Sequence, residues 1–182
     1  MRSSWLFLLL ISVLCSGQES KSSSTTHDQG APCLFKSEHG VVPDCIRKSA
    51  TGRYVISAPY VKDLDFDAHG LAPVRSESLG WMYVNKRGIV VVWGVPTFDN
   101  WADEFHNGLV RVLRNGKYGY ANRNGTLVIH PEYEGALSFD KGTAVVCRQC
   151  RTATDGEHSW FKGGNWFRID TAGKVIQRLK PQ

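Results

Sequence analysis

An internal repeat constrains the fold of this chain more than any other feature of its sequence. Three segments open on a glycine followed by small or aliphatic residues, at intervals of roughly 35 residues. They are residues 70–74, 108–112 and 142–146, and aromatic segments that end in glycine follow them at 81–88, 118–125 and 166–173. A unit of this length cannot bury its apolar face alone, so several units must stack on one another.

The residues within each unit favour short β-strands. Apolar runs bounded by glycine or asparagine are typical of strands, and the chain has 18 glycines and little helical periodicity. The dipeptides Asn115-Gly116 and Asn124-Gly125 tolerate the positive φ of a type I′ hairpin turn. Strands are predicted over residues 53–57, 89–93, 109–113, 126–129, 143–147 and 166–169.

These observations predict an all-β fold. We expect about three and a half tandem β-hairpin repeats, stacked into one curved sheet as a barrel-like or solenoid-like module. The repeats lie near residues 70–107, 108–141 and 142–182, and a partial repeat near 45–69 precedes them. The proline and phenylalanine of each exit segment are expected to pack between adjacent units.

The repeat resembles that of the WG repeat family. Residues 117–120 (Lys-Tyr-Gly-Tyr) stand where that family has lysine, tryptophan, glycine and an aromatic residue. The resemblance is strongest in residues 108–139 and extends over roughly 52–176, although Met82 and Phe167 replace the motif's glycine in two units. The resemblance implies a β-repeat scaffold with a binding role and no catalytic residues. Similar proteins are mostly bacterial, and many are exported.

The N-terminal residues predict export. Residues 1–17 are typical of a secretory signal peptide, because a positively charged start precedes an apolar run too short to cross a bilayer. Lipidation of Cys15 is the less favoured alternative. The polar residues 18–32 predict a flexible linker, and residues 33–182 a single domain. We therefore expect a protein of the bacterial periplasm, in preference to a secreted or lipid-anchored one, with no transmembrane helix.

Removal of the signal peptide leaves an even number of cysteines, which in an exported chain predicts disulfides. Proximity in sequence favours the pairs Cys33–Cys45 and Cys147–Cys150 among the three possible pairings. Cysteines three residues apart on a straight strand are too far apart to bond, so the second pair requires a turn at Arg148-Gln149. Two other roles for Cys147 and Cys150 are a zinc site with His158 and a redox-active pair, but a structural disulfide is preferred to both.

Candidate binding residues lie in two places. An insertion at residues 147–164 carries Trp160, Arg148 and Arg151, and an exposed tryptophan on a loop is a typical binding anchor. Arg111 and Arg114 lie among tyrosines in one hairpin, which predicts a solvated strand face able to receive an acidic partner surface. Such a face also suits nucleic acid, which an exported protein rarely meets, so no nucleic-acid partner is expected.

No catalytic pattern emerges from the sequence. It contains no glycine-x-serine-x-glycine elbow, HExxH helix or phosphate-binding glycine loop. The acidic pair Asp103-Glu104 is expected to lie exposed to solvent in a connector between repeats. No enzyme activity, cofactor or metal is expected. The leading hypothesis is an exported binding protein that inhibits or confers immunity to a protein partner, such as a toxin or envelope enzyme. The alternatives are a cell-wall or glycan-binding module and a thiol-disulfide oxidoreductase using Cys147 and Cys150.

Overall fold

The computed structural model describes residues 30–35 and 40–180. The predicted signal peptide and most of the predicted linker lie outside these residues. The first strand, β1 (Ala31–Leu34), begins just before the expected domain boundary. Within the described residues, none of the helical structure reaches the length and apolar character that a membrane span needs.

Antiparallel strands make up most of the described residues, with one four-residue helix, which confirms the all-β prediction. The first sheet has the strand order β3-β2-β1-β4-β5-β6, the second β11-β10-β9 and the third β12-β13-β16-β17. Two hairpins, β7–β8 and β14–β15, form small sheets of their own. The remaining elements are β2 (Val42–Lys48), β3 (Tyr54–Ile56), α1 (Ala58–Val61), β4 (Leu71–Ser76), β5 (Gly80–Asn85), β6 (Val90–Val95), β7 (Thr97–Phe98), β8 (Trp101–Ala102), β9 (Leu109–Arg114), β10 (Lys117–Asn122), β11 (Leu127–Tyr133), β12 (Gly135–Ala136), β13 (Thr143–Arg148), β14 (Arg151–Thr154), β15 (Ser159–Lys162), β16 (Asn165–Asp170) and β17 (Val175–Leu179).

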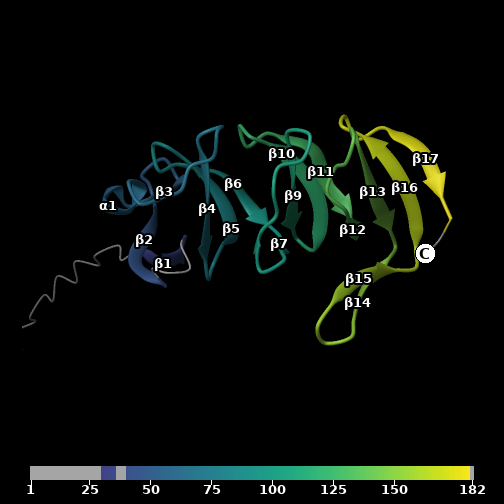
Figure 1. The fold of residues 1–182 in the computed structure, drawn as a ribbon, viewed down its shortest axis with the longest axis horizontal. Coiled ribbons are helices and arrows are strands. Elements are labelled where there is room, and N and C mark those ends of the chain that lie inside the picture. The colour runs from purple at the N-terminus through teal and green to yellow at the C-terminus, as the bar shows by residue number, and fades with distance from the viewer. Residues whose placement is uncertain (1–29, 36–39, 181–182) are drawn as a thin grey trace, which may run out of the picture.

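The three larger sheets follow one another along the long axis of the molecule, as in a solenoid (Figure 1). The repeats therefore form successive sheets, and the expectation of one curved sheet is corrected in this respect. The physical reason is that neighbouring units meet through side chains and turns. Apolar clusters fill the junctions, with Tyr83, Val92 and Val110 in one and Tyr120, Ile129 and Val146 in the next. Each junction is buried only because two units share it.

One turn recurs between the second and third strands of the units. In the turn at residues 122–125, the Asn122 side-chain oxygen accepts hydrogen bonds from the backbone N–H groups of Asn124 and Thr126, both at 3.0 Å. Only Gly125 has a positive φ there, 83°, so Asn124-Gly125 is not the predicted type I′ turn. Asn115-Gly116 does have positive φ at both residues, 51° and 73°, as predicted. The side-chain oxygens of Asn85 and Asp170 hold equivalent turns, and that of Asp67 holds a similar turn just before β4.

The glycine of this turn is also a stacking position. A Cβ atom on Gly125 would lie 2.0 Å from the Val91 carbonyl oxygen of β6. A Cβ atom on Gly88 would lie 2.9 Å from a Val61 methyl carbon, and one on Gly173 would lie 3.1 Å from Ile129. Each turn thus rests on the unit before it, and only glycine permits the approach.

The motif glycine of the second unit is explained by a similar approach. A Cβ atom on Gly119 would lie 2.5 Å from the Ile129 carbonyl oxygen, because β11 crosses close to β10 at a break in the strand register. The backbone of Gly119 does not have a positive φ. Glycine is required there because of the close approach of β11, and the backbone conformation itself would allow other residues. Met82 and Phe167 occupy this position in the other units.

The last unit differs from the others at the stacking positions. Tyr83 pairs across the sheet with Val92, and Tyr120 pairs with Ile129; both pairs are buried in the junctions. The corresponding pair in the third sheet is Arg168 with Gln177. The side of this sheet that faces away from the row therefore carries polar residues where the earlier sheets carry apolar ones.

Candidate functional site

A groove opens beneath the β14–β15 hairpin, which projects from the row of sheets on the same side as β7 (Figure 1). Its volume is about 560 Å³. We call it the hairpin groove. The residues that define it come from β7, β9, β10, β15 and the segment after β12: Phe98, Arg111, Tyr118, Leu137, Trp160 and Lys162.

The hairpin is held in place at its base. The Cys147–Cys150 disulfide closes a turn in which Gln149 has a φ of 60°, as the sequence required at Arg148-Gln149. The Phe161 ring meets Tyr118 edge-on, with centroids 5.5 Å apart, and contacts Gly135, where an added Cβ would lie 2.6 Å from the ring. The hairpin is therefore fixed to both the second and third sheets.

Exposed apolar side chains surround the groove. Phe98 is 61% exposed, Leu137 48% and Trp160 46%. These three residues are far apart in the sequence, and the fold gathers them at one hollow. Large apolar side chains grouped around a concavity are typical of a binding surface. Burial raises the pKa of the Tyr118 hydroxyl, so this group lines the groove as a neutral hydrogen-bonding partner.

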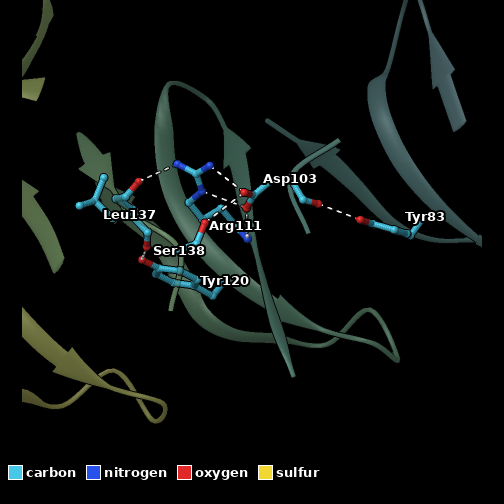
Figure 2. Close-up of polar contacts among 7 residues, drawn as sticks. Tyr83, Asp103, Arg111, Tyr120, Leu137 and Ser138 are labelled. Atoms are coloured by element: carbon cyan, nitrogen blue, oxygen red, sulfur yellow. Dashed lines mark hydrogen bonds and ion pairs between the residues drawn. The ribbon is translucent and has the colours of Figure 1, made fainter. Parts of the chain in front are cut away.

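A buried ion pair lies at the groove, where Arg111, one of the lining residues, pairs with Asp103 (Figure 2). Arg111 donates from Nε to Asp103 Oδ2 at 2.9 Å and from Nη2 to Asp103 Oδ1 at 2.8 Å. Its third nitrogen, Nη1, donates to the Ala136 carbonyl at 3.0 Å, and the Ser138 hydroxyl donates to Asp103 at 3.1 Å. Burial would lower the pKa of Arg111, but the hydrogen bond and charge of Asp103 outweigh it and raise that pKa. Arg111 is therefore charged throughout the physiological range.

Two tyrosines connect this network to the repeats. Tyr83 donates from its hydroxyl to the Asp103 carbonyl at 2.8 Å, and Tyr120 donates to the Leu137 carbonyl at 2.6 Å (Figure 2). Phe105 and Phe139 pack on these two rings, with centroid distances of 4.8 and 4.7 Å. The exit-segment phenylalanines thus pack between units, as predicted. Burial raises the pKa of both tyrosine hydroxyls, which remain neutral donors.

The structure corrects two predictions at this network. Arg111 was expected on a solvated strand face, but it is 8% exposed, because β9 is covered by units on both sides. Asp103 was expected in a solvated connector, but it is 1% exposed and neutralises Arg111. Arg111 still borders the hairpin groove, where its guanidinium carbon lies 6.0 Å from the Phe98 ring centroid.

The other candidate residues are dispersed. Trp160 is exposed as predicted and borders the groove. Arg148 pairs with Glu132 at 2.9 Å on another surface, and Arg151 is exposed in β14. Arg114 lies over the Trp93 ring, 3.9 Å from its centroid. Of the predicted binding residues, only Trp160 and Arg111 come together at one site.

Sequence reasoning missed Phe98 and Leu137. Phe98 precedes Asp99 and Asn100, which both have positive φ and form a tight hairpin turn between β7 and β8. A large apolar residue beside such a polar turn was a signal for an exposed aromatic side chain. Leu137 had no comparable signal, because its exposure follows from where the insertion folds.

Both predicted disulfides are present, Cys33–Cys45 and Cys147–Cys150. Their pairing leaves neither thiol of the second pair free to ligate zinc with His158, which lies near Asp155 at the hairpin tip. Among the residues that the structure describes, no three histidine, cysteine or acidic side chains are grouped as a metal site. Cys147 is fully buried and Cys150 is 7% exposed, packed with Trp166.

Comparison with protein families agrees with this architecture. The model described as the WG containing repeat matches residues 96–118 and 118–148. These matches meet at Tyr118, immediately before Gly119, whereas Met82 and Phe167 lie outside them. No curated protein sequence matches the chain. Residues 96–148 therefore carry the WG containing repeat that the sequence resembles.

Proposed function

We propose that this chain is a non-catalytic, exported binding protein whose hairpin groove receives an apolar side chain of a protein partner. In its most concrete form, it is an inhibitor or immunity-type protein that neutralises a toxin or envelope enzyme in the bacterial periplasm. The observation that carries the proposal is the convergence of Phe98, Leu137 and Trp160 on one hollow of about 560 Å³. Aromatic anchors beside a pocket dominate the affinity of many protein interfaces.

The positive charge of the hairpin groove favours a partner surface that carries negative charge. Arg111 and Lys162 are the charged residues that border it, and no carboxylate does so. Asp103 already neutralises Arg111, so Lys162 supplies the free positive charge. A partner segment with an aromatic or aliphatic side chain next to an acidic residue complements this arrangement.

The disulfides support the proposed compartment. Cys33–Cys45 lies at the first sheet and Cys147–Cys150 at the last, and disulfides of this structural kind persist in oxidising compartments. Burial of Cys147 and Cys150 argues against the oxidoreductase alternative, because a redox pair needs at least one accessible sulfur.

Site-specific cross-linking tests the proposal. A photoreactive phenylalanine analogue at Trp160 is expected to cross-link one protein in the envelope fraction of the producing cell. The same analogue at Ile176, which is 51% exposed on β17, is the matched control and is expected to give no such adduct. If both positions give the same adducts, or if neither does, the proposed site is wrong.

Purified components then separate the functional classes. The variant Phe98→Ala/Trp160→Ala is expected to bind the cross-linked partner at least tenfold more weakly, which corresponds to about 1.4 kcal/mol. Val175→Ala/Ile176→Ala removes two similarly exposed apolar side chains elsewhere and is expected to leave affinity unchanged. Stoichiometric loss of the partner's own activity on binding supports inhibition or immunity. Recovery of cell-wall glycan alone supports the glycan-binding alternative.

A further inference from the structure

A second groove lies among turns and strands away from the β14–β15 hairpin. Figure 1 shows the turns from β5 into β6 and from β10 into β11 on the edge of the row opposite that hairpin. The groove runs between the turn after β2, the turns at residues 67–70 and 85–88, strand β6, and the turn at residues 122–125 of the second sheet. Its volume is about 720 Å³. We call it the basic groove.

Positive side chains line this groove without acidic ones. Lys48, Arg53, Arg87 and Arg123 all border it, and so does His69. No aspartate or glutamate is among its lining residues. In the part of the chain that the structure describes, none of these four cations forms a salt bridge, whereas Arg111, Lys117 and Arg148 all do. Uncompensated positive charge gathered in a concavity attracts anions.

Arg123 is held in a particular orientation. Its guanidinium carbon lies 4.7 Å from the Phe105 ring centroid. Its Nε atom is buried and has no hydrogen-bond partner. The side chain is thus positioned by stacking and forms no salt bridge among the described residues, and its other side borders a hollow lined by Asp65, Asp67 and Glu104.

Aromatic rings flank the cations. Trp93 is 43% exposed at the groove and carries Arg114 on its ring, and Tyr54 lies beneath Lys48 with 5.9 Å between Nζ and the ring centroid. Exposed ring faces pack against the apolar C–H faces of sugars, while arginine and lysine bind sulfate, phosphate or carboxylate groups. We propose that the basic groove binds an acidic glycan, a sugar chain that carries such groups. This site is separate from the hairpin groove.

Calorimetric titration of the intact, disulfide-bonded protein tests the inference. A heparin-derived hexasaccharide is the probe for an acidic glycan, tripolyphosphate for a bare anion, and hexaglutamate for an acidic peptide. We expect the hexasaccharide to bind most tightly, with an affinity that falls as salt concentration rises. Arg53→Gln/Arg87→Gln, in which both residues are exposed, is expected to weaken this binding by about tenfold.

Two controls make the outcome decisive. Arg75→Gln/Arg151→Gln has the same net charge as the test variant but changes exposed arginines outside the groove, so it is expected to bind as the unmodified protein does. Trp93→Leu is expected to weaken binding of the hexasaccharide and leave that of tripolyphosphate unchanged. The proposal is overturned if both arginine pairs have equal effects, if tripolyphosphate or hexaglutamate binds as tightly as the hexasaccharide, or if Trp93→Leu has no effect.

Discussion

Replacement of Asp103 by asparagine is expected to destabilise the protein strongly. The carboxylate accepts hydrogen bonds from Arg111 Nε at 2.9 Å, from Arg111 Nη2 at 2.8 Å and from the Ser138 hydroxyl at 3.1 Å. The side chains of Arg111 and Asp103 are 10% and 1% exposed. Loss of one partner from a buried ion pair leaves an uncompensated charge and costs about 3–5 kcal/mol. That is a large part of the roughly 5–15 kcal/mol that stabilises a typical domain.

Urea unfolding followed by tryptophan fluorescence measures this effect as a change in the free energy of unfolding. The double variant Asp103→Leu/Arg111→Met removes both charges, so it is expected to lose less stability than either Asp103→Asn or Arg111→Met alone. Glu134→Gln is the matched control, because the Lys117–Glu134 pair has side chains 41% and 28% exposed and is expected to contribute at most about 1 kcal/mol. A loss below about 1 kcal/mol for Asp103→Asn would falsify the assignment of a buried, mutually dependent pair.

Two further variants test the stacking turn and the hairpin base. Gly125→Ala places a Cβ atom 2.0 Å from the Val91 carbonyl oxygen, whereas Gly116→Ala meets no atom within 4 Å at a similarly positive φ. Thermal unfolding is expected to show about 1–2 kcal/mol lost for Gly116→Ala and clearly more for Gly125→Ala, and equal losses would contradict the stacking role. Cys147→Ser/Cys150→Ser should loosen the hairpin and remove about 2 kcal/mol of stability. Limited proteolysis is expected to cut this variant first between residues 151 and 162, and unchanged cleavage would show that the disulfide does not hold the hairpin.

The sequence predicted the local features of the fold well. Turn chemistry and apolar runs depend on neighbouring residues, so the strand at residues 109–113 and the turn at Asn115-Gly116 could be located from the sequence. Both disulfides followed from proximity along the chain. The type of the turn at Asn124-Gly125 was missed, because the Asn122 side chain competes for the backbone and sets a longer loop.

The candidate site was predictable only in part. Trp160 was found because it lies in an insertion between two repeat strands. The burial of Arg111 could not be predicted. In the sequence, an arginine that alternates with apolar residues indicates a solvent-exposed strand face, and only the packing of units on both sides of the strand buries it. Its partner Asp103 belongs to the exit segment of the preceding unit, and no sequence pattern pairs the two. The groove itself depends on where the hairpin folds over Phe98 and Leu137, which is a matter of tertiary packing.

The polar pair Arg168 and Gln177 interrupts the apolar stacking that joins the earlier sheets. Where earlier sheets present tyrosine with valine or isoleucine, this sheet presents charge and amide, so it lacks the apolar pair through which the earlier units stack. Arg168 and Gln177 thus leave the outer face of the last described sheet without the tyrosine pair that stacks the earlier units. Exchanging them for tyrosine and valine would turn the end of the row into a growth point, and head-to-tail filaments would be the natural product.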